Sequence, residues 1–428
     1  MKTNRRQFLS TAVPGGLAAT LPLSACIRSD SINSSPTIKD RYGMLDKILK
    51  QPVFRKEFFN SPVFIESIEL LRYENNFLCR VRSKDGAEGI SVGHGVLQNL
   101  YPIFTNLVQP FFINKDARDL DLLLEKVFIY RLNFRLSGQA LGVPLATIEL
   151  AILDMMGRIA GKSIGQLIGD IHHPEVEVYQ ATEYRHLPVK ESMELIIRDV
   201  NENNARAVKI KIGGLMYHTE DIDVFGPPGR TEAMIPLVRK TFGDEMVLYA
   251  DSNSFYSVEE AIRAGKLLEE YNYQFFEEPV PFHWYEETKQ VADSLSIPVA
   301  GGEQEFSLHG FRWLIANDGL EIVQPDVFYF GGMVRSMKVA LMAKTFGKQC
   351  TPHMSGGDLG FLYMMHFVSA LPNAMPHHEF KGFRTNLDFE CKTSPLQSVN
   401  GVVQVPTGPG SGVDINPDFI EKFQLVKD

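Results

Sequence analysis

Six short apolar segments of this chain each run into a polar or charged residue, and their spacing is nearly regular. The first is Val247–Asp251, in which four apolar residues precede an aspartate. The six terminal residues are Asp251, Glu277, Glu303, Asp326, His353 and Glu379, at steps of 26, 26, 23, 27 and 26 residues. Each step has the length of one strand, one helix and two connections. The pattern therefore predicts a repeating β/α unit with a functional side chain at the end of each strand.

Two further strands are predicted upstream, over residues 176–181 and 205–212, with a helix over 190–201 between them. Helical patterns over 257–271 and 332–346 join later strands. Eight parallel strands with intervening helices are typical of a closed barrel, in which all strand ends face one mouth. A doubly wound open sheet is the alternative, but it would not place a polar residue at the end of nearly every strand.

A separate α+β domain is expected before the barrel, over residues 42–172. Its predicted strands cover 64–71, 77–82 and 89–92, and its predicted helices cover 97–108, 117–130 and 144–160, the last ending at Gly161. The barrel then occupies residues 173–400, and residues 401–428 are expected to return to the first domain. The loop over 213–229 makes one connection longer than the others and is a candidate lid over the barrel mouth.

The first 26 residues have the character of an export signal. Asn4–Leu9 resembles the twin-arginine signal, and Leu23–Cys26 resembles the bacterial lipobox behind a short apolar region. We expect cleavage before Cys26, a lipid on its sulfur, a flexible tether over 27–41, and a periplasmic protein held to the membrane only by that lipid. The alternative is a cytosolic protein with a basic start. A formal net charge of −9 argues against nucleic acid as a partner.

Asp251, Glu277 and Glu303 would bring three carboxylates together at adjacent strand ends. Like charges in a buried site repel strongly, so a cation is needed. Ligation by carboxylate oxygens alone selects a hard divalent ion, and we expect Mg²⁺ with open positions for a substrate. The alternative is that each carboxylate is a solvated cap of the helix that follows it, which three successive cases disfavour.

Lys209 and Lys211 alternate with Ile210, so on a strand both ammonium groups point the same way. Two like charges side by side, with a divalent cation near them, are expected to depress the lysine pKa and make a neutral amine available as a base. The alternative is an exposed basic face of an edge strand, which the apolar neighbours of these lysines disfavour.

Asp326 and His353 end successive strands and are expected within hydrogen-bond reach, where the carboxylate would orient the imidazole. A structural histidine is the alternative. Glu379 is either a salt-bridge residue or a carboxylic acid held neutral to donate a hydrogen bond. A cation on a substrate carboxylate would let the α-C–H bond lose its proton, with Lys211 and His353 as bases on opposite faces.

These motifs together resemble the enolase superfamily in its mandelate racemase subgroup, and the resemblance covers roughly residues 60 to 415. The motifs are Lys209–Lys211, Asp251–Asn253, Glu277–Pro279, Gly302–Glu303, Gln324–Asp326 with Gly331–Gly332, and Pro352–His353. The resemblance implies a (β/α)7β TIM-type barrel with an N-terminal α+β capping domain. It also implies a Mg²⁺-dependent reaction that begins with α-proton abstraction from a carboxylate, and it suggests a homo-oligomer.

By position, the resemblance makes Asp251, Glu277 and Glu303 metal ligands and Lys211 one acid/base group. It makes His353 with Asp326 the other acid/base group, and Lys209 and Glu379 supporting or substrate-binding residues. Asn253 stands beside the metal where galactonate-dehydratase-like members carry a histidine, so their general acid is absent. The first two strands are joined by the short turn Arg72–Asn76, so specificity should depend on the segment around His94 and on the 213–229 loop.

The hypothesis for function is a carbon–oxygen lyase that dehydrates a sugar acid. Lys211 or His353 would take the α-proton, and protonated His353 would assist loss of the β-hydroxyl. A racemase, epimerase or cycloisomerase with the same residues is the first alternative. A lipid-anchored binding protein without catalysis is the second, and it is disfavoured because none of the motif positions is lost.

Overall fold

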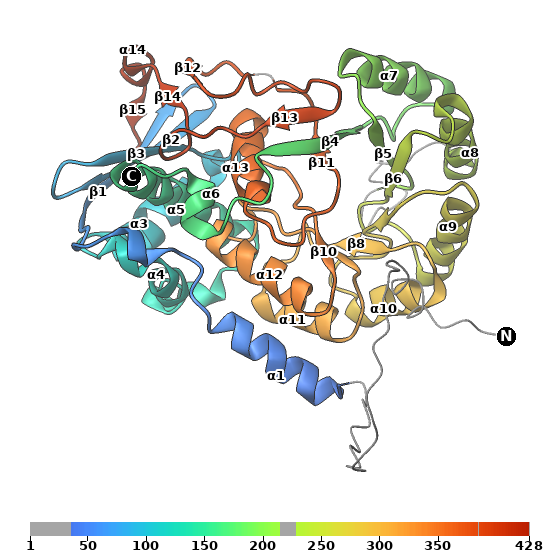
Figure 1. Ribbon diagram of the computed structural model, residues 1–428, viewed down its shortest axis with the longest axis horizontal. Helices are drawn as coiled ribbons and strands as arrows, with labels where there is room; N and C mark the ends of the chain where they lie inside the picture. The colour runs from blue at the N-terminus through green and yellow to red at the C-terminus, as the bar shows by residue number, and fades with distance from the viewer. Residues whose placement is uncertain (1–35, 215–227, 384, 428) are drawn as a thin grey trace, which may run out of the picture. The chain divides into compact units, whose positions relative to one another are not determined.

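The computed structural model describes residues 36–214, 228–383 and 385–427, and Ile38–Asp428 form one compact unit (Figure 1). The export signal, residues 27–35 of the predicted tether and the 213–229 loop apart from its ends lie outside the described residues. The prediction of a flexible tether is wrong for residues 38–41, which form the first turn of the helix α1 (Ile38–Leu49). One helix of the described part, Gln139–Ala160, is long and apolar enough to cross a membrane, but 94% of its apolar 18-residue stretch is buried inside the protein. It is a core helix.

The N-terminal part of the unit contains a four-stranded antiparallel sheet. Its strands are β1 (Ile65–Tyr73), β2 (Asn76–Ser83), β3 (Glu88–Val92) and β15 (Gln424–Leu425), in the order β15-β1-β2-β3. A two-residue turn joins β1 and β2, so the connection is as short as the sequence indicates. α5 (Gln139–Ala160) packs against β2 and β3. The sheet and its helices form the capping domain.

The other helical elements before the barrel are short, and the predicted helices over 97–108 and 117–130 are each divided into shorter pieces. These elements are α1 (Ile38–Leu49), η2 (Lys56–Phe58), α2 (Leu97–Ile103), η3 (Phe104–Val108), α3 (Gln109–Phe112), η4 (Ala117–Asp119), α4 (Leu120–Lys126), η5 (Tyr130–Arg135) and α6 (Ile164–Ile168). The predicted helix over 97–108 changes to a π-helical turn at η3, just after Pro102, which lacks the N–H that a regular helix needs. The predicted helix over 117–130 stops at Lys126, because the buried Asn133 amide caps the carbonyl of Val127.

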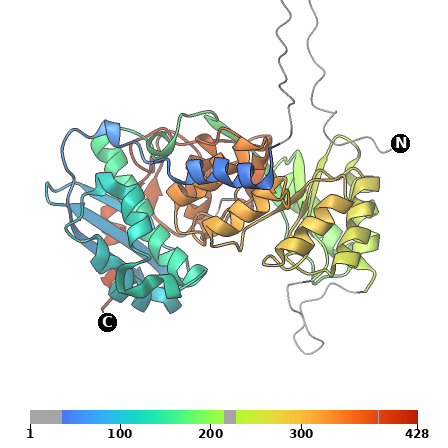
Figure 2. The ribbon, with the colours of Figure 1, turned by 90° about the horizontal axis from the view of Figure 1, so that it is seen from below.

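The capping helix α5 begins five residues before its predicted start, and it ends as predicted. Gly161 terminates it in the left-handed conformation, with φ 63°. α1 lies along two helices of the barrel, α11 (Leu308–Ala316) and α12 (Met333–Thr345) (Figure 2).

Eight parallel strands form the barrel, which confirms the predicted fold class. They are β4 (Glu175–Ala181), β5 (Ala207–Lys211), β6 (Val247–Asp251), β7 (Phe276–Glu277), β8 (Val299–Gly301), β9 (Ile322–Val323), β10 (Gln349–Cys350) and β11 (His378–Phe380). The order is β10-β9-β8-β7-β6-β5-β4-β11 with parallel neighbours, and a parallel bridge from Cys350 to Ala374 closes the ring between its two ends. The arrangement is the (β/α)7β barrel.

In the described part of the chain, seven helices connect these strands. They are α7 (Val189–Glu202), α8 (Arg230–Phe242), α9 (Val258–Glu270), α10 (Tyr285–Ser294), α11 (Leu308–Ala316), α12 (Met333–Thr345) and α13 (Gly357–Ser369). Inside the barrel the rings of Tyr179, Tyr249 and Phe275 pack together, with centroids 4.2 Å apart for Tyr249 and Phe275. The interior is therefore a filled core, and chemistry is confined to the mouth.

After the barrel the chain contacts both domains. It contains β12 (Phe389–Glu390), β13 (Val402–Gln404), β14 (Asp414–Ile415) and α14 (Pro417–Ile420) before β15. β13 pairs with the barrel strand β4 and not with the capping sheet (Figure 1). Only β15 returns to the capping sheet, where it pairs with β1.

A buried carboxylate joins the capping domain to the barrel. The Glu149 carboxylate of α5 accepts hydrogen bonds from the backbone N–H groups of Met333 (2.6 Å) and Val334 (2.9 Å), at the start of α12. Burial raises the pKa of Glu149 to about 8. Gly332 precedes α12 with φ 120°, and a Cβ at this position would lie 2.1 Å from a Glu149 oxygen. Only glycine allows this close approach.

Gly332→Ala should therefore destabilise the protein by more than about 2 kcal/mol, because backbone strain and a steric overlap add together. The matched control is Gly347→Ala, where φ is 69° but no atom lies within 4 Å of the new Cβ. That variant should lose only about 1 kcal/mol, from strain alone. Urea unfolding of the two variants measures the difference, and equal losses would show that the contact with Glu149 is not the cause.

Candidate active site

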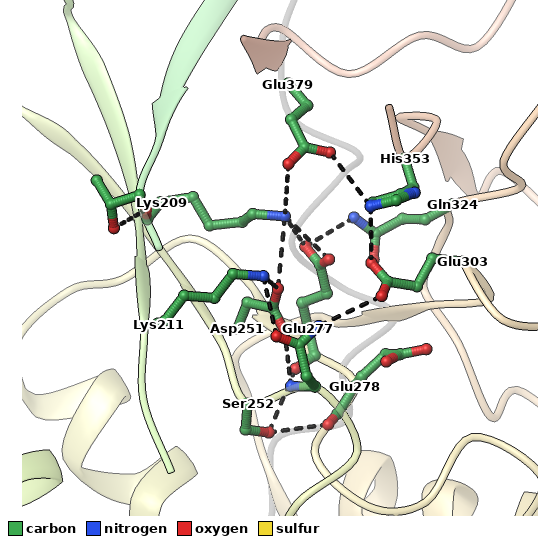
Figure 3. A network of polar contacts seen from close by, with 12 residues as sticks. Lys209, Lys211, Asp251, Ser252, Glu277, Glu278, Glu303, Gln324, His353 and Glu379 are labelled. Atoms are coloured by element: carbon green, nitrogen blue, oxygen red, sulfur yellow. Dashed lines mark hydrogen bonds and ion pairs between the residues drawn. The ribbon is translucent and has the colours of Figure 1, made fainter. Parts of the chain in front are cut away.

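Asp251, Glu277 and Glu303 form a compact acidic cluster at the barrel mouth (Figure 3). Asp251 and Glu277 are the last residues of β6 and β7, and Glu303 follows β8 by two residues. The strands are parallel neighbours in which Asp251 pairs with Glu277, so the register itself brings the side chains together. All three are buried, and one oxygen from each lies within 4.8 Å of the others.

The electrostatics of the cluster show that it fits a divalent cation. Burial and the nearby Asp251 raise the pKa of Glu277 to about 8, so the cluster resists full ionisation without a counter-charge. Oε2 of Glu303 is buried and has no hydrogen-bond partner among the described residues. Three carboxylates with an oxygen left free are a donor set suited to Mg²⁺.

The two lysines of β5 are buried against these carboxylates. Nζ of Lys209 lies 2.8 Å from Oε2 of Glu277 and 3.8 Å from Oε1 of Glu379. Lys211 forms a short ion pair with Asp251 and donates to Oδ1 of Asn253 at 3.0 Å. The predicted shared orientation of the two ammonium groups is confirmed, and the edge-strand alternative is wrong because β5 lies between β4 and β6.

Without a cation the pKa values of both lysines are raised, and the depression expected beside a divalent cation stays a prediction. Burial lowers the pKa of Lys211, but Asp251 and other carboxylates outweigh both burial and the like charge of Lys209, so the net shift is upward. Burial also lowers the pKa of Lys209, but Glu277, Glu379 and Asp251 outweigh burial and raise that pKa well above its usual value. The sequence indicated the like-charged pair but not how closely the anions surround it.

Asp326 and His353 lie in hydrogen-bond contact on the other side of the carboxylates. Nδ1 of His353 is 2.7 Å from Oδ2 of Asp326, and Nε2 is 3.5 Å from Oε2 of Glu303. The other Asp326 oxygen accepts from the backbone N–H groups of Phe328 and Tyr329, which fixes the carboxylate. Burial lowers the pKa of His353, but the surrounding carboxylates raise it to about 10. The imidazole is held in one orientation.

Glu379 is a salt-bridge residue. It lies within β11, and its oxygens contact Lys209 at 3.8 Å, Lys381 at 3.5 Å and the backbone N–H of Met354 at 3.0 Å. Burial raises the pKa of Glu379, but Lys209 and Lys381 outweigh burial and hold it well below its usual value. The alternative of a neutral carboxylic acid is therefore wrong for this residue.

His94 and Asn253 both lie near the mouth, but only Asn253 touches the site. The His94 ring packs against Phe328 and Tyr329, each with centroids 5.6 Å away, and Tyr329 in turn faces His353. Asn253 donates from Nδ2 to Oε1 of Glu303 at 3.3 Å.

Sequence reasoning assigned no role to several residues of the network, although Gln324 stands in one of the motifs. Gln324 donates to Glu277 at 2.9 Å, Lys381 pairs with Glu183 at 2.8 Å, and Arg185 donates to Asn253. Gln324 and Lys381 stand two residues from Asp326 and Glu379, so strand alternation would have indicated them. No pattern marks Arg185 or Glu183, which lie in the loop after β4.

The site therefore places proton-transfer groups on two sides of an anionic centre. Lys209 and Lys211 enter from β5, whereas His353 enters from the opposite side, with the carboxylates between them (Figure 3). A carboxylate substrate held at the centre would present one face to each side.

A family model described as enolase C-terminal domain-like matches residues 192–419. The arabinonate dehydratase of Saccharolobus solfataricus is 26% identical over 350 residues, which cover 80% of this chain and 89% of that protein. The D-galactarolactone cycloisomerase of Agrobacterium fabrum is 29% identical over 294 residues, which cover 66% of this chain and 74% of that protein.

Comparison with solved structures indicates the same family. The crystal structure of a mandelate racemase/muconate lactonizing protein from Paracoccus denitrificans PD1222, complexed with magnesium, is 25% identical and superposes with a TM-score of 0.75. The superposition covers 85% of this chain and 99% of that one. With the matched family model spanning most of the barrel, the chain belongs to the enolase superfamily, in its mandelate racemase subgroup.

Proposed function

We propose that this protein is a Mg²⁺-dependent hydro-lyase that dehydrates a sugar acid. The observation that carries the proposal is the buried triad of Asp251, Glu277 and Glu303 between two proton-transfer groups, Lys211 and His353. A dehydratase relative that aligns over 80% of this chain supports the reaction class.

The triad would hold the cation, and Mg²⁺ when bound would neutralise charge that builds on a substrate carboxylate. Lys209 and Glu379 form a buried ion pair beside the triad. Glu379 thereby holds the Lys209 ammonium group where a substrate oxygen would lie. Lys211 or His353 removes the α-proton, and the C–H electrons move onto the carboxylate. The bond from the β-carbon to its hydroxyl oxygen then breaks, with the electron pair leaving on oxygen, and His353 supplies the proton that makes the leaving group water.

The geometry of the Asp326–His353 pair suits the protonation of the departing hydroxyl. Asp326 binds Nδ1, so Nε2 is the nitrogen that faces Glu303 and the centre of the site. A histidine fixed in this way can take a proton on one side of the substrate and return it to a departing oxygen. The product is an enol that rearranges to a 2-keto acid.

A racemase, epimerase or cycloisomerase is the second candidate, because the two proton-transfer groups lie on opposite sides and a cycloisomerase is among the relatives. A binding protein without catalysis is disfavoured, because the eight predicted positions remain connected by hydrogen bonds and ion pairs. These positions are Lys209, Lys211, Asp251, Glu277, Glu303, Asp326, His353 and Glu379.

A sugar-acid library offered to the Mg²⁺-loaded enzyme should yield a 2-keto acid from at least one member. Carbonyl derivatisation of the products measures the outcome, and the Asp251→Asn variant serves as the inactive control. If a library member is racemised or cyclised and no keto acid forms, the protein is a racemase, epimerase or cycloisomerase and not a dehydratase.

We also propose that the protein is exported and lipid-anchored through Cys26, on the strength of the twin-arginine and lipobox patterns. Cys26→Ser should move the protein from the membrane fraction to the soluble fraction of the cell envelope. Cys391→Ser is the matched control and should stay with the membrane. An unchanged distribution of the Cys26 variant would rule out the lipid anchor.

A further inference from the structure

Arg185 is a buried guanidinium that links three strand ends at the barrel mouth. It lies in the loop after β4, its residue is 4% exposed, and it donates to the carbonyl of Gly214 beyond β5 and to Oδ1 of Asn253 beyond β6. In the described part of the chain no carboxylate forms a salt bridge with it, so its hydrogen bonds go to neutral oxygens. Burying a charged guanidinium without a paired carboxylate costs folding free energy, so its presence here suggests a functional role.

The loop that carries Arg185 is itself held in place. The guanidinium of Arg230, at the start of α8, donates to the carbonyls of Tyr184 (3.0 Å), Leu187 (3.1 Å) and Lys211 (2.9 Å). The loop after β4 is thereby fastened to the end of β5, and Arg185 is presented from a fixed backbone.

The contacts of Asn253 determine which way its amide faces. Oδ1 accepts from Arg185 and from Lys211, and Nδ2 donates to Oε1 of Glu303 at 3.3 Å. A lysine that exchanges a proton during catalysis selects the amide oxygen less strictly, because its neutral form has a lone pair that can also accept from the amide nitrogen. An arginine stays charged at every working pH and always requires an oxygen.

The amide orientation matters for Glu303. Oε1 of Glu303 accepts from Asn253 and from Gln304 (3.1 Å), which leaves Oε2 without a hydrogen bond among the described residues. A reversed amide would turn the oxygen of Asn253 toward that carboxylate, and the two acceptors would repel. Groups that orient a metal ligand in this way commonly change metal affinity by about 10- to 100-fold when removed.

We infer that Arg185 is a positioning residue that fixes the Asn253 amide, which in turn aligns Glu303 for the metal and holds Lys211 beside it. The inference rests on the proposed metal site but not on the identity of the substrate. It also accounts for the asparagine at this position, since one amide can serve a carboxylate and a lysine at once.

The first test uses Mn²⁺ as the probe and needs no substrate. Arg185→Met, Asn253→Ala and the double variant should each bind Mn²⁺ about 10-fold more weakly than the native protein, measured by electron paramagnetic resonance. Because both residues act through one amide, the double variant should be no weaker than Asn253→Ala alone. Additive losses, or native affinity in Arg185→Met, would overturn the inference.

Arg239→Met is the matched control. In the described part of the chain Arg239, like Arg185, donates only to neutral oxygens, which for Arg239 are the backbone carbonyls of Tyr271, Asn272, Gly243 and Met246, but it lies at the opposite end of the strands. The Arg239 variant should lose thermal stability and keep native Mn²⁺ affinity. Arg185→Lys should recover part of the affinity, because an ammonium keeps the charge but does not reproduce the planar fork that reaches both oxygens.

The second test uses the sugar acid that the library identifies. Arg185→Met should lower kcat about 10-fold with KM within about 3-fold, and it should change kcat little in the Asn253→Ala background. A raised KM with native kcat and native Mn²⁺ affinity would instead make Arg185 a substrate-binding group. If no sugar acid reacts, the proposed function fails, and the Mn²⁺ measurements still decide the role of Arg185.

Discussion

Replacing Lys211 by alanine or His353 by asparagine should lower the rate of dehydration by about 10²- to 10⁴-fold, because each variant loses a group that transfers a proton. The two groups lie on opposite sides of the acidic cluster, Lys211 against Asp251 and His353 3.5 Å from Glu303. The variants should therefore differ in the exchange of the substrate α-proton with D₂O. The variant that keeps the abstracting base should still exchange the proton, and the other should not.

Two buried residues of the same types serve as controls. Lys348 donates to the carbonyl of Leu320, and His366 contacts the carbonyl of Ser411, both away from the cluster. Lys348→Ala and His366→Asn should lose stability but keep near-native turnover at a temperature where they are folded. Full turnover in both Lys211→Ala and His353→Asn would show that the two-base assignment is wrong.

Glu303→Gln should abolish metal-dependent activity while leaving the fold intact. The change removes one of three ligand charges, so Mg²⁺ affinity should fall by at least about 100-fold, which exceeds the usual effect of an outer-shell partner. The variant also relieves the repulsion that raises the pKa of Glu277, to which Glu303 contributes. The metal-free variant should therefore be no less stable than the metal-free native protein in urea unfolding.

The matched control is Glu305→Gln, which alters another buried carboxylate only two residues away. Glu305 accepts from the backbone N–H groups of Phe306 (2.9 Å) and Ser307 (2.7 Å) and does not belong to the acidic cluster. This variant should retain Mg²⁺ affinity. Exhaustive chelation of the native enzyme should remove activity and added Mg²⁺ should restore it; activity that survives chelation would contradict the carboxylate-triad site.

The sequence predicted the barrel and the acidic cluster because both depend on local pattern and spacing. An apolar run that ends in Asp251 marks a buried strand, and parallel register places Glu277 beside it. The strand ends were less well predicted. Asp326 and His353 follow Pro325 and Pro352, which lack the N–H needed to continue a sheet, so both side chains stand on loops beyond β9 and β10.

The remaining features depend on tertiary contacts that no local pattern records. Arg185 stands in an irregular loop, and its importance comes only from its contact with Asn253, 68 residues away. The raised pKa of Lys211 also depends on residues that are distant in the sequence. Its like-charged neighbour Lys209 is visible in the sequence, whereas the carboxylates that reverse the shift arrive from other strands.

The central claim is that a base of this site removes the α-proton before the β-hydroxyl leaves. A sugar acid carrying deuterium at the α-carbon tests it directly, with the Mg²⁺-loaded enzyme in ordinary water and the product analysed by NMR. The carbon that loses the hydroxyl should gain hydrogen from the solvent and carry none of the label. Complete migration of the α-deuterium to that carbon, in the native enzyme and in the Lys211→Ala and His353→Asn variants alike, would show a hydride shift that needs no base, and it would contradict the roles of Lys211 and His353.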